Sequence, residues 1–296
     1  MVYGAASTGI RAMTSSSSPG ISLKQEGISY AAGADLPCVY VNMVRGGPGL
    51  GSIAPAQSDY FQSTRGGGHG DYHVLVLAPK SVQEAADLTY KAFELADKWR
   101  MPAMILADGL IGQMMESVEL PPYYDPKSLI DKTDWQVGGM YKNHRKAHHV
   151  TSIILDPTLL EKKVFDRFER YKKIQHTEVL FEEKNCSDAD VILVAYGSSA
   201  RVCQGAQQMA IKAGLKVGLF RPITLWPFPS TELKKISKTG AIFLVVEMSM
   251  GQMIEDIRLS VHDTVPVISL PHTGGVVPNE DEVFARIQEI LKGEKQ

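Results

Sequence analysis

The sequence predicts an α/β protein built from two doubly wound domains. Apolar runs without polar alternation recur along the chain and end at Gly, Pro or Asp, which is typical of buried parallel strands. Helical patterns separate these runs, and strands that alternate with helices favour a doubly wound sheet. At 296 residues, with 44% hydrophobic and 22% charged residues, the chain is long enough for two such domains.

The first domain is expected to cover residues 1–122. A short strand is indicated at 11–13, and longer buried strands at 36–44, 73–78 and 101–107. A helix is predicted from Ser81 to Trp99, because Ser81 and Glu84 have the spacing of a capping box and apolar residues follow at helical intervals.

An irregular connector is expected at residues 123–188, after Pro121 and Pro122. It contains the basic run 142–149 and a charged helix at about 158–173. The second domain, residues 189–296, then resumes the alternation. Its strands are predicted at 191–195, 217–220, 241–246 and 265–270, and its helices near 199–213, 230–238, 251–262 and 280–291.

Bulk properties exclude several classes of function. The formal net charge of -2 and the pI near 6.5 offer no field for nucleic acid or an anionic membrane. No apolar run approaches the roughly 20 residues that span a bilayer, and no export signal is seen, so a soluble cytoplasmic protein is expected. The three cysteines lie too far apart in the sequence to hold an iron–sulfur cluster or a zinc site, which favours isolated reduced thiols at Cys38, Cys186 and Cys203.

Four serines followed by Pro19 and Gly20 form the first candidate site. The run Ser15–Ser18 follows a strand-like segment and precedes a helical pattern, so hydroxyls and backbone N–H groups would gather at a helix N-terminus. This arrangement favours a ligand-facing turn. A flexible serine loop is the alternative.

The glycine-rich segment 45–51 is the second candidate. Its glycines do not keep the G-x-G-x-x-G order and no Lys-Ser/Thr follows, which argues against a nucleotide loop. Arg45 stands at the end of a predicted strand, where a planar guanidinium can bind a carboxylate through two donors. An arginine in an inter-domain salt bridge is the alternative.

Other polar residues are weaker candidates. Gln57 and Asp59 follow the glycine loop and could cap the next helix. His69 lies in a glycine-rich segment and is as plausibly a loop residue as a proton carrier. The pairs His69 and His73, and His144 and His148, have metal-like spacings but no completing ligand, so no metal site is predicted. Two turns stay open: Asp108-Gly109 either orients a site wall or closes a turn, and 196–199 resembles an anion nest.

The block from Met13 to Asp108 carries a resemblance to a known family. Its motifs resemble the alpha subunit of the thiamin-diphosphate-dependent 2-oxoacid:ferredoxin oxidoreductases, and most of all the branched-chain 2-ketoisovalerate member. The resemblance implies a pyrimidine-type thiamin-diphosphate-binding domain followed by a transketolase C-terminal-like domain. Residues 1–9 resemble the interior of a family helix, so we expect an N-terminally truncated chain whose first domain lacks its first strand.

The resemblance also implies a reaction and its partners. Family members oxidatively decarboxylate a 2-oxoacid with coenzyme A and reduce ferredoxin. It assigns Arg45 to the 2-oxoacid carboxylate, Ser16 and Ser17 to the substrate and the aminopyrimidine ring, and Gln57 and Asp59 to the cofactor side. A beta subunit would share the thiamin diphosphate and hold magnesium, and gamma and ferredoxin-like delta subunits would complete the enzyme with its iron–sulfur clusters.

No catalytic acid or base is identified within these residues. The resemblance places the activating glutamate in the segment expected to be missing. Two alternatives therefore stay open beside the branched-chain enzyme: a 2-oxoglutarate:ferredoxin oxidoreductase alpha subunit, and an inactive truncated assembly fragment.

Overall fold

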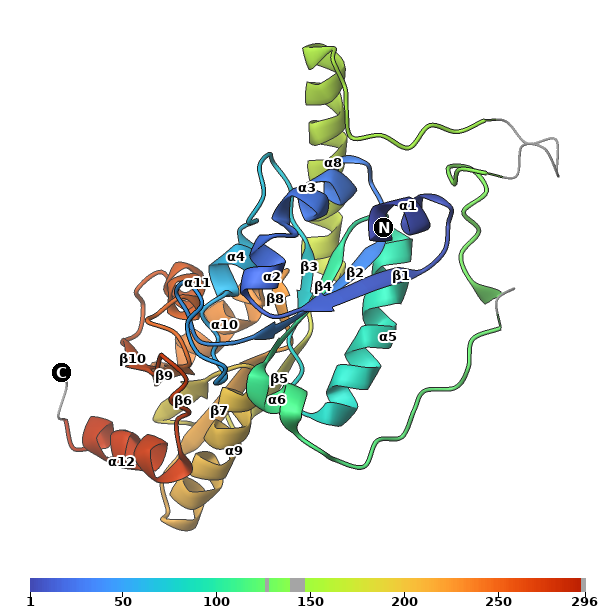
Figure 1. Ribbon diagram of the computed structural model, residues 1–296. Coiled ribbons are helices and arrows are strands. Elements are labelled where there is room, and N and C mark those ends of the chain that lie inside the picture. The colour runs from blue at the N-terminus through green and yellow to red at the C-terminus, as the bar shows by residue number, and fades with distance from the viewer. Residues whose placement is uncertain (126–127, 139–146, 294–296) are drawn as a thin grey trace.

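The computed structural model describes residues 1–125, 128–138 and 147–293. Most of the basic run 142–149, with His144, lies outside these residues, as does part of the expected connector. The described residues form two five-stranded sheets with helices packed around them (Figure 1). The predicted α/β class is confirmed.

The first sheet has the strand order β1-β2-β4-β3-β8. Its first four strands are parallel and β8 is antiparallel to β3. The strands are β1 (Ala12–Ser16), β2 (Cys38–Val44), β3 (Leu75–Leu77), β4 (Ala103–Asp108) and β8 (Thr224–Trp226). The helices of this region are α1 (Val2–Ser7), α2 (Pro19–Ser22), α3 (Gln25–Gly33), α4 (Tyr60–Thr64), α5 (Val82–Trp99) and α6 (Gly109–Gln113).

The second sheet has the strand order β10-β9-β6-β7-β5, again parallel except for one edge strand. Its strands are β5 (Phe181–Lys184), β6 (Val191–Val194), β7 (Val217–Pro222), β9 (Ile242–Glu247) and β10 (Val267–Pro271). The helices are α9 (Gly197–Lys212), α10 (Ser230–Ile236), α11 (Met253–Val261) and α12 (Glu280–Leu291), with a 3₁₀ turn at Ser237–Thr239.

The long parallel strands and their helices lie where the apolar periodicity predicts them. The predicted N-cap is confirmed, since the Ser81 hydroxyl accepts a hydrogen bond from Glu84 N at 3.1 Å and α5 begins at Val82. The reciprocal half of the capping box differs, because the Glu84 carboxylate accepts from Lys80 N at 2.9 Å, one residue before the cap. The serine run differs from the prediction. Strand β1 continues through Ser15 and Ser16, which pair with Val41 and Asn42 of β2, so the turn begins later than expected.

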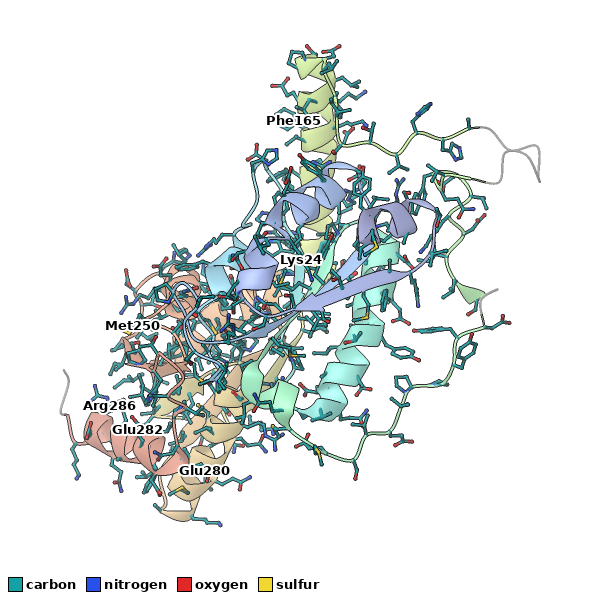
Figure 2. The ribbon with its side chains drawn as sticks, viewed as in Figure 1. Lys24, Phe165, Met250, Glu280, Glu282 and Arg286 are labelled. Atoms are coloured by element: carbon teal, nitrogen blue, oxygen red, sulfur yellow. The ribbon has the colours of Figure 1, made fainter. Side chains whose placement is uncertain are left out.

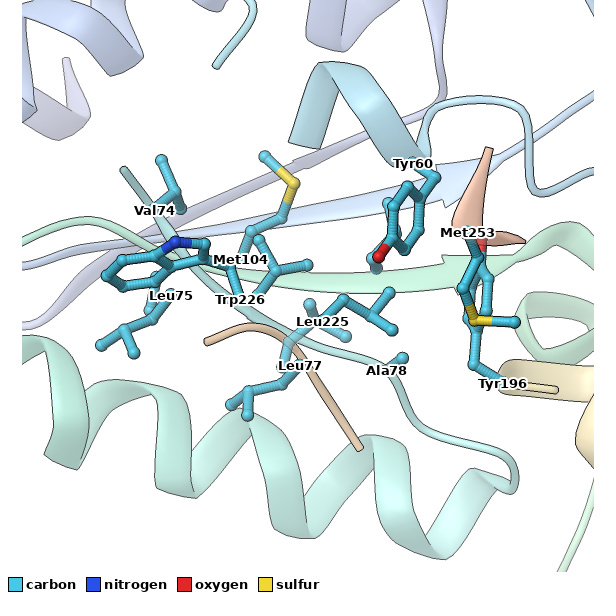
Figure 3. Close-up of a cluster of buried hydrophobic side chains, with 14 of the residues drawn as sticks. Tyr60, Val74, Leu75, Leu77, Ala78, Met104, Tyr196, Leu225, Trp226 and Met253 are labelled. Carbon is cyan, nitrogen blue, oxygen red and sulfur yellow. The ribbon is translucent and has the colours of Figure 1, made fainter. Parts of the chain in front are cut away.

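Two antiparallel edge strands are absent from the sequence prediction. Strand β8 belongs to the second half of the chain but pairs with β3 of the first sheet. Its Leu225 and Trp226 are buried beside Leu75 and Leu77, in one core that also joins residues of α4 and α11 (Figure 3). The sheets therefore share a core, and the division at residues 122 and 188 stays a prediction.

Helix α8 (Pro157–Thr177) is longer than the predicted charged helix. Asp156 accepts hydrogen bonds from Thr158 N and Leu159 N and begins it. The C-terminal half buries Tyr171 and Ile174, whereas the N-terminal half stands away from the body, with Phe165 at its surface (Figures 1 and 2). None of the helices in the described ranges is both long and apolar enough to cross a lipid bilayer.

Candidate functional site

Most of the polar candidate residues named from the sequence lie at or just after the carboxyl ends of parallel strands in the two sheets. Ligands in open α/β sheets bind beyond these ends. Here the region divides into two parts. We call residues 16–18 and 45–54, after β1 and β2, the rim. We call Gln57, Asp108, 196–199 and 247–248 the junction, because they connect the two sheets.

A buried asparagine holds the base of the rim. Asn42 on β2 is fully buried, and its Oδ1 accepts a hydrogen bond from Ser18 N at 3.0 Å. Its Nδ2 donates to Asp59 Oδ2 at 2.9 Å. The Ser18 hydroxyl accepts from Arg45 N at 3.1 Å. The turn after β1, the end of β2 and Asp59 therefore form one hydrogen-bonded unit.

Ser16 and Ser17 differ from Ser18. Both are half-buried, and their hydroxyls make no hydrogen bond to any residue that the structure describes. The Ser16 hydroxyl lies so close to Gly20 that a Cβ there would come within 1.9 Å of its Oγ. These two predicted site residues thus have donors left over for a ligand. Their assignment to substrate stays a prediction.

Arg45 has a structural role in the rim. Its Nη1 donates to the carbonyls of Leu50 at 2.7 Å and Ser52 at 3.1 Å, which closes the glycine loop. The other guanidinium nitrogens make no hydrogen bond or ion pair within the described ranges. The loop therefore holds the guanidinium in place while leaving donors for an anion, and the inter-domain salt bridge considered from sequence is not formed.

Asp108 is the centre of the junction. Its carboxylate is 2% exposed and accepts four hydrogen bonds. Oδ1 receives those from Leu110 N and Ile111 N, which cap α6, and Oδ2 receives those from Ser198 N and Ser198 Oγ at the start of α9. One carboxylate thus binds the N-terminal ends of both α6, beside the first sheet, and α9, beside the second. The predicted anion nest at 196–199 holds this carboxylate.

The Gln57 side chain is also hydrogen-bonded within the junction. Its side chain, 1% exposed, donates to the Tyr196 carbonyl at 2.8 Å and accepts from Ser199 Oγ at 3.0 Å and Met248 N at 2.9 Å. Both polar atoms of the carboxamide are therefore hydrogen-bonded within the junction. This geometry gives no support to the predicted cofactor contact of Gln57, and the predicted contact of Asp59 stays a prediction.

Two further features stabilise the junction: close packing at Gly197 and a neutral tyrosine at position 196. Gly197 has a positive φ of 57°, and a Cβ there would lie 2.9 Å from Gln57 Nε2, so only glycine fits. Burial, together with the carboxylates of Glu247 and Asp108, raises the pKa of Tyr196 well above its usual value. Tyr196 therefore stays neutral and donates to the Gln57 carbonyl at 3.1 Å.

Sequence reasoning did not identify Asn42 or Glu247. Asn42 is a polar residue inside the apolar run of β2, and this interruption is the signal that could have found it. Glu247 ends β9 fully buried, where its carboxylate accepts hydrogen bonds from Ser249 Oγ and the N–H groups of residues 252–254. An acidic residue that ends a buried strand before a helix is the corresponding signal.

The remaining histidine candidates have structural partners. The His69 ring meets the Tyr30 ring edge-on with centroids 6.3 Å apart, and the His73 ring stacks on Trp226 at 4.6 Å. His148 Nδ1 lies 3.1 Å from the Gln136 carbonyl. Burial lowers the pKa of His73. The described residues contain no group of three metal-ligating side chains.

The three cysteines are buried and free in the structure. Burial raises the pKa of Cys38 to about 11 and that of Cys186 to about 12, and it also raises the pKa of Cys203. A thiolate is the form that binds metal or attacks a disulfide. The environment of each thiol therefore disfavours both reactions.

Comparisons with known proteins give this arrangement a family. Residues 1–183 match the family described as pyruvate flavodoxin/ferredoxin oxidoreductase, thiamine diphosphate-binding, and residues 189–283 match pyruvate:ferredoxin oxidoreductase core domain II. The chain belongs to the 2-oxoacid:ferredoxin oxidoreductase family. The resemblance seen in the sequence is confirmed, and the chain is a subunit of an oxidoreductase whose acceptor is an iron–sulfur protein.

Curated members of this family differ in similarity to the chain. The ketoisovalerate oxidoreductase subunit VorB of Methanothermobacter marburgensis is 51% identical over 263 residues, covering 88% of this chain and 73% of that protein. The 2-oxoglutarate synthase subunit KorA of Methanothermobacter thermautotrophicus is 30% identical over 320 residues, covering 97% and 82%. The oxidoreductase subunits are thus related along nearly the whole chain.

Solved structures of 2-oxoacid:ferredoxin oxidoreductases share the fold. The 2-oxoglutarate:ferredoxin oxidoreductase of Magnetococcus marinus, solved with 2-oxoglutarate, coenzyme A and succinyl-CoA bound, aligns with a TM-score of 0.82 at 25% identity. The alignment covers 97% of this chain but 54% of that one. A split-gene transketolase has a TM-score of 0.58 at 13% identity, which shows a similar fold alone.

Proposed function

We propose that this oxidoreductase subunit acts on a branched-chain 2-oxoacid, 2-ketoisovalerate. The reaction cleaves the bond between the carboxyl and oxo carbons, releases carbon dioxide, passes the electron pair to ferredoxin and transfers the acyl group to coenzyme A. The similarity to VorB favours this substrate over the 2-oxoglutarate alternative, because the identity with KorA is lower.

The observation that carries the proposal is Arg45 at the carboxyl end of β2. The rim loop orients its guanidinium through Nη1, and its remaining donors suit the planar carboxylate shared by all 2-oxoacids. The unpaired hydroxyls of Ser16 and Ser17 lie at the last residue of β1 and at the start of the turn after it, where they would contact the substrate beside this carboxylate.

Thiamin diphosphate supplies the carbanion-stabilising chemistry when bound. Ser16, Ser17 and Asp59 are the side chains of this chain that would border its aminopyrimidine ring. They fit such a role because two have unused hydroxyls and Asp59 is held in place by Asn42. Gln57 is not included, since the junction uses its carboxamide.

The rest of the site would come from other chains in the cytoplasm. We assign the magnesium ion and the diphosphate contacts to a beta subunit, and the iron–sulfur clusters to ferredoxin-like partners with gamma and delta subunits. Three buried, protonated thiols on separate elements support placing the clusters elsewhere.

The test uses the purified complex that contains this chain. Dye or ferredoxin reduction is measured with coenzyme A and either 2-ketoisovalerate or 2-oxoglutarate. We expect kcat/KM for 2-ketoisovalerate to exceed that for 2-oxoglutarate by at least about tenfold, the scale on which apolar and charged side chains are discriminated. A preference for 2-oxoglutarate would contradict the proposed substrate.

A further inference from the structure

The rim loop between β2 and α4 has a fixed shape. Ser52 N donates to the Gly46 carbonyl at 2.9 Å, and Gly46 N donates to the Ala54 carbonyl at 2.9 Å. Arg45 Nη1 closes the interior through Leu50 O and Ser52 O. These hydrogen bonds hold residues 46–54 in one conformation, so the loop cannot easily fold back to bury its exposed side chains.

The second domain supports this loop from outside. A Cβ on Gly275, in the segment after β10, would lie 2.3 Å from Ala54 Cβ, so the two backbones are in close contact. Gly46 is similarly close to Gly274, whose carbonyl carbon would lie 3.3 Å from a Cβ. The loop is therefore held at both of its ends and along one side.

This fixed loop displays two large apolar side chains to solvent. Leu50 is 83% exposed and Ile53 is 85% exposed. Water disfavours the exposure of large apolar side chains, and these two stand on one loop of fixed shape at the ligand-binding edge of the sheet. Because the loop is closed, the two side chains gain burial only when another molecule reaches the rim.

Leu50 is the one linked directly to the substrate-binding arginine. Arg45 Nη1 donates to the Leu50 carbonyl itself at 2.7 Å, whereas its other acceptor among the described residues is the carbonyl of Ser52, not that of Ile53. In a 2-oxoacid the alkyl branch begins one carbon beyond the oxo group, so it lies within a few bonds of the carboxylate. A carboxylate on the free guanidinium nitrogens would therefore bring that branch to the loop that carries Leu50, whose backbone carbonyl binds the same guanidinium.

We propose that Leu50 contacts the alkyl branch of the 2-oxoacid and determines specificity. This assignment rests on the proposed function and on Arg45 as the carboxylate ligand. A branched aliphatic group would share its apolar contact with Leu50. The second carboxylate of 2-oxoglutarate would lose hydration against the same side chain without gaining a hydrogen bond.

The test compares Leu50→Ser with Ile53→Ser in the purified complex. Ile53 is the matched control because it lies on the same loop with nearly the same exposure. We expect Leu50→Ser to lower the ratio of kcat/KM for 2-ketoisovalerate to that for pyruvate by about 10- to 100-fold, the scale for one or two apolar groups. Ile53→Ser should keep the ratio within about threefold of wild type.

Several outcomes overturn the assignment. An unchanged ratio in an active Leu50→Ser complex would show that the branch lies elsewhere. Loss of a partner chain from that complex, seen by size-exclusion chromatography, would show that Leu50 covers protein instead of substrate. By contrast, a wild-type complex that does not prefer 2-ketoisovalerate defeats the proposed function itself, before any variant is compared.

Discussion

The rim and the junction lie at the same edge of the sheets but use their polar groups in opposite ways. In the junction, each polar atom described for Asp108 and Gln57 bonds to the protein, and both side chains are nearly fully buried. In the rim, Ser16, Ser17 and most of the Arg45 guanidinium have donors left over. The junction therefore serves stability, and the rim is where a ligand can bind.

This difference has an energetic basis. A buried polar group without a partner costs about 1–3 kcal/mol, so the junction must be complete to be stable. A half-exposed hydroxyl can form a hydrogen bond with water, so it destabilises the fold little when no ligand is bound. Substitutions in the junction should therefore lower the free energy of unfolding, whereas substitutions in the rim should lower activity and leave stability nearly unchanged.

The largest expected effect is on stability, in Asp108→Ala. The change leaves three N–H donors, two of them buried, and one buried hydroxyl without their acceptor at the starts of α6 and α9, so we expect a loss of about 4 kcal/mol of unfolding free energy. Urea denaturation measures it. The exposed Asp188→Ala is the control and should stay within about 0.5 kcal/mol. A loss below about 1 kcal/mol for Asp108→Ala would show that the junction does not join the domains.

Arg45→Ala should show the reverse behaviour. Losing a charge-assisted contact to the carboxylate is expected to lower kcat/KM by about one to three decades, which corresponds to roughly 2–4 kcal/mol of transition-state binding. Stability should change by less than about 1 kcal/mol, because Arg45 is only part-buried. Steady-state kinetics of the complex together with a urea titration test both halves of this statement. Unchanged kinetics would remove Arg45 from the site.

The two regions also differ in how well the sequence predicts them. The rim could be found because its serines and glycines interrupt apolar strands near each other in the chain. The junction could not, since Gln57 and Ser199 lie 142 positions apart and their pairing depends on how the sheets pack. Strand β8 was missed for a similar reason: its three residues have no periodic pattern, and tertiary pairing with β3 alone makes them a strand.

A second contact between the first-sheet region and the second sheet is built from charges, and its strength should depend on pH. Burial opposes the charge on Glu182, but hydrogen bonds from Lys184 and Lys80 and the nearby Arg221 outweigh it and lower the pKa to about 2. A carboxyl group with a lowered folded-state pKa adds stability above its usual pKa, near 4.5, and this stability is lost as the pH falls toward 2.

Glu182→Gln should remove that dependence. We expect a loss of about 1 kcal/mol at neutral pH, reduced by solvent screening, and a shallower decline than wild type between pH 4.5 and 2. Urea titrations at several pH values measure both. Glu183→Gln, on the exposed side of the same strand, is the control. Parallel profiles for Glu182→Gln and wild type would show that hydrogen bonds alone, and not charges, join the domains.

The smallest expected effect compares one serine from each region. Ser199 donates to Gln57 Oε1 at 3.0 Å while fully buried, so Ser199→Ala should cost about 1 kcal/mol of unfolding free energy with little change in kcat. The Ser16 hydroxyl has no hydrogen-bond partner in the described residues, so Ser16→Ala should leave stability within about 0.5 kcal/mol but lower kcat/KM. A double-mutant cycle of Ser199→Ala with Gln57→Leu should show a coupling of at least about 0.5 kcal/mol. If Ser16→Ala instead reduced stability and left activity unchanged, its hydroxyl would serve the fold, and the distinction between rim and junction would fail at that position.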